Sequence, residues 1–151
     1  MAIYARILCP IDGSATSARG LEEAIRFALD QRASLRLLYV IEAHLAAMDP
    51  YGHVNLTELI ESSRTYGLQL LDKAASDARE RGVQCETGLL DTLSGPVGEL
   101  IANDALGWKA ELIVMGTHGR RGLKRAVMGS DAELVVRASQ VPVLLVKGSG
   151  D

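Results

Sequence analysis

A glycine-rich segment carries the residues of this chain that are best suited to holding a phosphate group. Glycines occur at Gly116, Gly119, Gly122 and Gly129, and Ser130 follows the last of them. Glycine lets a backbone approach a ligand closely and reach positive φ, so that neighbouring N–H groups can converge on an anion. Ser130 opens an amphipathic segment, and a helix N-terminus attracts negative charge. The spacing predicts a phosphate site, although turn glycines and a capping Ser130 would require the same residues.

Basic side chains and one histidine lie in the same segment. Arg120, Arg121, Lys124 and Arg125 add positive charge, which either contacts phosphate oxygens or stays solvated at the ends of long side chains. His118 has no triad partner and no metal-ligand partner in the sequence, so a structural contact is its simpler interpretation. We therefore assign no catalytic residue.

A carboxylate follows the first apolar run, in the stretch Pro10-Ile11-Asp12-Gly13-Ser14. Asp12 can accept hydrogen bonds from ribose hydroxyls or bind a divalent ion through its oxygens. Alternatively, Asp12 or Ser14 caps the helix that follows. The turn lacks G-x-G-x-x-G and the chain lacks G-x-x-x-x-G-K-[ST], which excludes the usual dinucleotide fingerprint and the P-loop.

Short apolar runs alternate with long amphipathic segments, which predicts one α/β domain over residues 1–151. Strands are expected at residues 5–11, 35–41, 83–90, 112–115 and 141–146. Helices are expected at residues 14–32, 56–78, 97–105 and 130–138, with loops at 42–55 and 116–129. This alternation produces a parallel sheet covered by helices on both faces. Ligands of such sheets lie beyond the carboxyl ends of the strands, so the residues after the first and fourth strands are expected to meet at one site.

Composition limits the classes of partner and compartment. Hydrophobic residues make up 48% of the chain, charged residues 23%, and the net charge is -3. Nucleic-acid-binding domains are usually basic, so this charge argues against nucleic acid as the main partner. No signal peptide and no membrane-spanning stretch is recognisable. Cys9 and Cys85 lie in apolar runs and the three histidines lack ligand spacing, so we expect buried thiols in a reducing, cytoplasmic compartment and no zinc site.

The spacing Gly116-x2-Gly119-x9-Gly129-Ser130 resembles the ATP-binding motif of the universal stress protein family. Three further segments agree with that family: Asp12-Gly13-Ser14, Leu112-Ile-Val-Met-Gly116-Thr-His-Gly119 and Val141-Pro-Val-Leu-Leu-Val146. The resemblance covers residues 5–147. The segment 87–96 departs from the family's usual compact turn.

The resemblance implies a Rossmann-like, open, five-stranded parallel sheet in the order 3-2-1-4-5, with a bound adenine nucleotide: ATP, ADP or AMP. It implies adenine near Asp12 and Val40, ribose near Asp12 and Gly116, and phosphates on the later glycines and serine of the motif, with Mg²⁺ or Mn²⁺ beside them. The residues expected at the nucleotide are Pro10, Asp12, Val40, Met115, Gly116, His118, Gly119, Arg120, Gly129 and Ser130. Members of the ATP-binding branch act in stress tolerance as nucleotide-dependent switches, so we expect nucleotide binding with slow hydrolysis at most.

The last strand, Val141–Val146, lies at an edge of a sheet with this order. A bare apolar edge invites pairing with another chain, so we expect a homodimer through this strand. Such dimers are common in the family that the chain resembles. A covering C-terminal tail is the alternative, but residues 148–151 form a short one.

Two other functions fit parts of the sequence. A dimeric interaction module without a physiological nucleotide would need only the fold and the edge strand. A phosphoacceptor receiver domain would use Asp12, Asp91, Thr117 and Lys147. The receiver interpretation lacks a second carboxylate after the first strand and leaves the glycine spacing unexplained.

Overall fold

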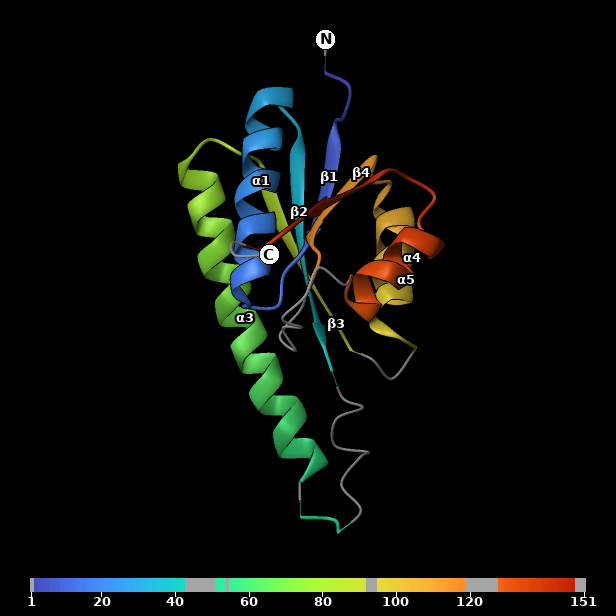
Figure 1. The fold of residues 1–151 in the computed structure, drawn as a ribbon. Coiled ribbons are helices and arrows are strands. Elements are labelled where there is room, and N and C mark those ends of the chain that lie inside the picture. Colours follow the sequence, from blue (N-terminus) through green and yellow to red (C-terminus); the bar gives the residue numbers. More distant parts are fainter. Residues whose placement is uncertain (1, 43–50, 54, 92–94, 119–127, 149–151) are drawn as a thin grey trace.

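A five-stranded parallel sheet forms the centre of the computed structural model, which describes residues 2–42, 51–53, 55–91, 95–118 and 128–148 (Figure 1). Its strands are β1 (Arg6–Pro10), β2 (Ser34–Ile41), β3 (Cys85–Asp91), β4 (Leu112–Gly116) and β5 (Val143–Val146). Their order is β3-β2-β1-β4-β5. The predicted fold class and strand order are confirmed.

Two helices cover each face of the sheet. Helices α1 (Ala15–Gln31) and α3 (Leu56–Glu80) lie on one face, and α4 (Val97–Trp108) and α5 (Ser130–Ala138) lie on the other (Figure 1). Alternate residues of a strand point to opposite faces. On β1, Ile7 and Cys9 therefore join the core cluster beneath α1 and α3, while Leu8 joins the cluster beneath α4 and α5. Because both faces are buried, the inner strands are apolar without alternation, which is why they are readable in the sequence.

Element boundaries follow local backbone chemistry. Helix α5 has the predicted bounds. Strand β5 begins two residues later than expected, because the Ser139 hydroxyl donates to the carbonyl of Val141 and accepts from its amide, which holds a turn there. Helix α3 continues to Glu80, and the chain reverses at Gly82 with φ 96°. The amino-terminal turns of α3 extend beyond the carboxyl ends of the strands, here called the carboxyl edge of the sheet (Figure 1).

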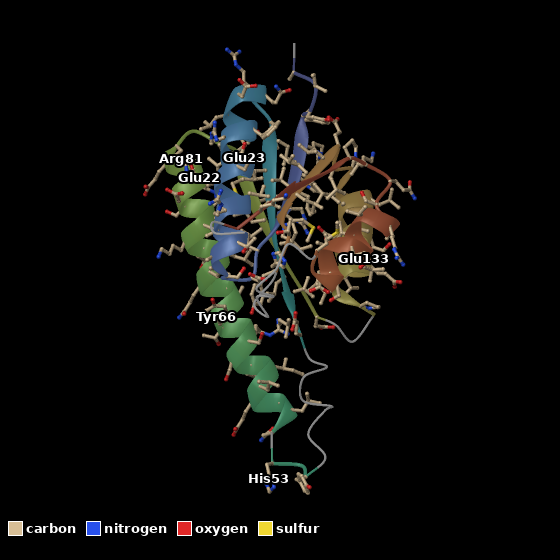
Figure 2. All side chains as sticks on the ribbon, viewed as in Figure 1. Glu22, Glu23, His53, Tyr66, Arg81 and Glu133 are labelled. Atoms are coloured by element: carbon tan, nitrogen blue, oxygen red, sulfur yellow. The ribbon has the colours of Figure 1, made fainter. Side chains whose placement is uncertain are left out.

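Charged pairs connect neighbouring elements. Arg36 of β2 donates two hydrogen bonds to Asp104 of α4, at 2.8 and 3.0 Å, and its pKa is raised chiefly by those bonds. Arg81, after α3, donates to both carboxylate oxygens of Glu22 on α1, and the two side chains lie beside each other in Figure 2. That hydrogen-bonded pair lowers the pKa of Glu22. The Arg36–Asp104 pair is the more buried of the two, so it fixes α4 more strongly than the exposed pair fixes α3.

The expectation of two buried thiols holds for one cysteine only. Cys9 is fully buried at the centre of β1, whereas Cys85, on the edge strand β3, is only partly buried. Burial raises the pKa of both thiols, that of Cys85 to about 11. Both cysteines are free. Among the described helices, none combines the length and the apolar character needed to cross a bilayer.

Helices α4 and α5 are in close contact at Gly98, which gives a test of the packing. A Cβ atom there would lie 2.6 Å from the Leu134 Cβ atom and 2.9 Å from the carbonyl oxygen of Asp131. We expect Gly98→Ala to lower the free energy of unfolding by about 1–3 kcal/mol through overpacking. Gly107, on the same helix, has no neighbouring atom within 4 Å of such a Cβ. Gly107→Ala should instead raise stability by up to about 1 kcal/mol. Urea denaturation measures both, and equal midpoints for the two variants would contradict this packing.

Candidate functional site

Three hydrogen bonds fix the turn between β1 and α1. The Asp12 amide donates to the Ser17 hydroxyl at 3.1 Å, the Ser14 amide to Asp12 Oδ1 at 2.8 Å, and the Ser17 amide to the Ser14 hydroxyl at 3.1 Å. Between them Gly13 has φ 86°, which favours glycine. Ser14 is thus the N-cap of α1, as one alternative proposed, while Asp12 lies two residues before it with its carboxylate oriented by the turn.

Helix α1 approaches the end of β4 closely at two glycines, Gly20 and Gly116. A Cβ atom on Gly116 would lie 2.8 Å from Thr16 Cγ2 and 2.9 Å from the Thr16 carbonyl oxygen. A Cβ atom on Gly20 would lie 3.0 Å from the Gly116 amide nitrogen. Gly116 does not have positive φ, so close approach, and not an unusual backbone angle, explains this glycine. The contact brings the turn that carries Asp12 beside the carboxyl end of β4.

The two ends of the glycine-rich segment are joined by a hydrogen bond. The Gly129 amide donates to the carbonyl of Thr117 at 2.7 Å, and the Thr117 amide donates to the carbonyl of Val146 on β5 at 3.0 Å. The start of α5 is thereby held against the end of β4. Gly119 and Arg120 lie outside the described residues, as do the basic residues at 121, 124 and 125.

Helix α5 begins at Ser130, with Gly129 as its N-cap at φ -62° and ψ 154° and no side-chain cap. Its first intrahelical bond runs from the Glu133 amide to the Gly129 carbonyl at 3.0 Å. The alternative that Ser130 is a capping serine is therefore wrong, because Ser130 is already the first helical residue. The amides that precede Glu133 have no intrahelical acceptor, and this end of the helix carries a partial positive charge.

His118 is buried at the end of β4, with 8% of its surface exposed. Its Nδ1 atom lies 3.0 Å from the Thr117 hydroxyl, which agrees with the structural contact expected for it. Its Nε2 atom is also buried and has no hydrogen-bond partner among the described residues. A buried polar atom is stabilised by about 1–3 kcal/mol when it gains a partner, so Nε2 is suited to a polar group outside the described residues.

The other expected residues lie at the same edge of the sheet. Pro10 is the last residue of β1 and is half-buried, and Val40 lies one residue before the end of β2. Met115, in β4, is 7% exposed. The side chains of Val40 and Met115 belong to the core beneath α4 and α5, which leaves their backbone groups as the means of contacting a ligand.

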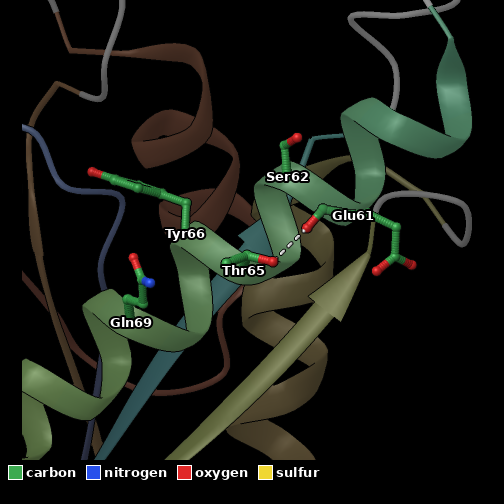
Figure 3. Close-up of a pocket in the computed structure, with 5 residues that line it drawn as sticks. All are labelled: Glu61, Ser62, Thr65, Tyr66 and Gln69. Carbon is green, nitrogen blue, oxygen red and sulfur yellow. Dashed lines mark hydrogen bonds between the residues drawn. The ribbon is translucent and has the colours of Figure 1, made fainter.

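Two hollows open near this edge. One, of about 210 Å³, lies at the ends of β2 and β3 and is lined by Ile41, Arg64, Leu89, Leu90, Asp91 and Leu100. The other, of about 430 Å³, runs along α3 and is lined by Glu61, Ser62, Thr65, Tyr66 and Gln69 (Figure 3). Sequence reasoning did not single out Tyr66 or Ser17, because their roles depend on contacts with the β1–α1 turn. Among the described residues, no group of three His, Cys, Asp or Glu side chains is arranged to hold a metal ion.

Residues 3–147 match the model of the universal stress protein family. The chain belongs to that family. It is 35% identical to Universal stress protein MJ0531 of Methanocaldococcus jannaschii over 96% of this chain and 83% of the relative. It is 34% identical to Universal stress protein YxiE of Bacillus subtilis, over 96% of this chain and 100% of the relative.

Solved structures share the fold. The structure of MJ0577 from Methanocaldococcus jannaschii has a TM-score of 0.84 and 24% identity, over 99% of this chain and 100% of the other. A universal stress protein solved in complex with cAMP has a TM-score of 0.67 and 22% identity, over 95% of this chain and 97% of the other. The universal stress protein of Archaeoglobus fulgidus in complex with dAMP has a TM-score of 0.64 and 22% identity, over 97% and 100%.

The hydrogen bonds of the β1–α1 turn yield a prediction for Ser17→Ala. The variant leaves the partly buried Asp12 amide without its acceptor, so the free energy of unfolding should fall by about 1 kcal/mol. Hydrogen exchange at the Asp12 amide should become faster in the folded protein. Ser62→Ala, at an exposed position on α3, is the control and should leave both quantities unchanged. Wild-type stability and exchange in Ser17→Ala would show that the turn is held by other contacts.

Proposed function

We propose that this protein binds ATP at the carboxyl edge of the sheet, between the ends of β1 and β4, and acts as a nucleotide-dependent switch in the stress response. The observation that supports this most directly is the hydrogen bond from the Gly129 amide to the Thr117 carbonyl. It holds the positive end of α5 at the strand ends where the strand order reverses. Open parallel sheets bind their ligands at this point.

The contacts around that bond fit the parts of a nucleotide. The carboxylate of Asp12, oriented by its bond from the Ser14 amide, is suited to accept from ribose hydroxyls. Backbone groups near Val40 are suited to contact the base, and the N-terminal amides of α5 are suited to bind the phosphates. Since the Gly129 amide is already bonded to Thr117, Gly129 contributes space for a phosphate and not a donor.

His118 and an accompanying Mg²⁺ or Mn²⁺ ion are compatible with the same proposal. The buried Nε2 atom of His118, which has no partner in the part of the chain that the structure describes, is suited to a polar group of the nucleotide or a water beside it. Because the described residues offer no side-chain metal cluster, Mg²⁺ or Mn²⁺ would be held mainly by the phosphate oxygens, with the Asp12 carboxylate as a further candidate ligand. Such an ion would neutralise phosphate charge.

The relatives solved with cAMP and dAMP support an adenine nucleotide as the ligand. Among the described residues His118 has no carboxylate partner that would make it a general base toward water at a γ-phosphate, so we propose little or no hydrolysis. Two free cysteines and a fold with no apparent membrane span among the described helices are compatible with a cytoplasmic protein.

Calorimetry with nucleotide-free protein tests the proposal, after acid extraction has identified any co-purified nucleotide. ATP should bind, and Mg²⁺ should change its affinity. Gly129→Val should weaken ATP binding at least about tenfold, because a branched side chain occupies the phosphate space. Its backbone angles suit valine, so the fold should survive. Gly107→Ala, on the opposite end of α4 from Gly98, is the control. No affinity for ATP, ADP or AMP would favour a dimeric interaction module instead.

We also propose that the protein forms a homodimer through β5. The strand lies at one edge of the sheet and consists of four apolar residues, Val143–Val146. The carbonyl of Pro142 accepts from Ile113 of β4, and the carbonyl of Val146 accepts from Thr117 just after β4. In a regular parallel ladder the amide of Val143 therefore faces away from β4. An outward amide on an apolar edge is suited to pairing with the same edge of a second copy.

Val143→Pro tests that interface. Proline removes the outward amide while it leaves the hydrogen bonds to β4 intact. We expect wild-type protein to sediment as a dimer at micromolar concentration and the variant to sediment as a monomer with unchanged circular dichroism. A variant that remains dimeric would place the interface elsewhere.

A further inference from the structure

We propose that Tyr66 is a positioning residue of the nucleotide site: it holds the β1–α1 turn so that Asp12 can distinguish ribose from deoxyribose. This inference rests on the proposed nucleotide binding. It concerns a side chain from α3, an element that carries none of the residues that the sequence analysis expects at the nucleotide.

The first observation is a direct contact between Tyr66 and the turn. The Tyr66 hydroxyl lies so close to Gly13 that a Cβ atom on this glycine would overlap it. The side chain projects from α3 on the same side as Gln69 (Figure 3). Gly13 has φ 86° and could adopt many other angles as a glycine, so a side chain packed against it restricts this freedom.

The second observation is that Tyr66 is supported from the core. Its ring meets the ring of Tyr39 edge-on, with centroids 6.0 Å apart and planes at 65°. Tyr39 belongs to β2 and is 2% exposed, and its hydroxyl lies 3.4 Å from the Ser63 hydroxyl on α3. Gly67 has no side chain where the Tyr39 ring lies against α3. The buried Tyr39 ring of β2 therefore supports the Tyr66 ring, and Tyr66 contacts Gly13 of the β1–α1 turn.

The third step connects the turn to recognition. Asp12 Oδ1 accepts from the Ser14 amide, so the direction of the carboxylate depends on the conformation of Gly13 between them. A hydrogen bond to a ribose hydroxyl needs the acceptor within a few tenths of an ångström of its ideal place. If Gly13 gains alternative conformations, the bond to the hydroxyl weakens, while contacts of the base and phosphates with other elements persist.

A purely structural Tyr66 would behave differently. Tyr66 is 44% exposed, so its ring could serve only to cover Tyr39. In that case removal of the ring would lower the free energy of unfolding, or lower the affinity for all nucleotides by the same factor. The ratio of affinities for ribose and deoxyribose nucleotides separates the two roles, because only the orientation of Asp12 changes that ratio.

The experiment compares ATP, 2′-deoxy-ATP and 3′-deoxy-ATP by calorimetry on wild-type protein, Tyr66→Phe, Tyr66→Ala and Leu68→Ala. Leu68 is the matched control, since it lies on α3 with 46% exposure. We expect wild-type protein to prefer ATP about tenfold over at least one deoxynucleotide, the worth of one good hydrogen bond. Tyr66→Ala should reduce that preference to about twofold or less, Tyr66→Phe should fall between, and Leu68→Ala should match wild type.

A measurement without nucleotide accompanies the titrations. The Ser14 amide, which is bonded to Asp12, should exchange its hydrogen several-fold faster in folded Tyr66→Ala than in Leu68→Ala. An unchanged ratio of affinities in Tyr66→Ala, or an equal weakening of all three nucleotides, overturns the positioning role and leaves nucleotide binding standing. Wild-type protein that binds none of the three would overturn the proposed function and this inference together.

Discussion

The close approach of α1 to β4 is the contact on which the candidate site depends. Gly20 and Gly116 have no side chains where the helix meets the strand, and Thr16 fills the remaining space. A larger residue at either glycine would push the helix outward. The turn that carries Asp12 would then move away from the end of β4. The site is therefore a consequence of helix–sheet packing. The β1–α1 turn and the end of β4 meet because α1 is closely packed on the sheet.

Around that contact, the site is assembled mainly from backbone groups. The Gly129 amide, the Thr117 carbonyl and the first amides of α5 set its shape. Backbone groups are held by the secondary structure, so they keep their directions without the entropy cost of ordering long side chains. A phosphate that meets such amides is bound by groups that are already oriented. This arrangement suits the proposed binding of a nucleotide.

Side chains from outside the glycine-rich segment hold the β1–α1 turn in its conformation. Ser17 holds the amide of Asp12, and Tyr66 lies against Gly13 from a helix that is distant in sequence. In the sequence alone, nothing distinguishes Ser17 or Tyr66 from other residues of amphipathic helices. Their position at the turn follows from how α1 and α3 pack side by side on one face. The same face includes Tyr39, which is buried and braces Tyr66.

The sequence by itself determined the fold class and the elements that bear the site, and its resemblance to the family supplied the strand order. Buried strands need apolar runs and covering helices need apolar stripes, and both patterns are visible in the order of residues. It also indicated Asp12, Gly116, Gly129 and Ser130, because glycine spacing and helix starts are local features. Only the tertiary structure decided that Gly129 and not Ser130 is the N-cap, that Cys85 is only partly buried, and that Tyr66 reaches Gly13. These outcomes depend on which surfaces of different elements meet, and distance along the chain does not encode that.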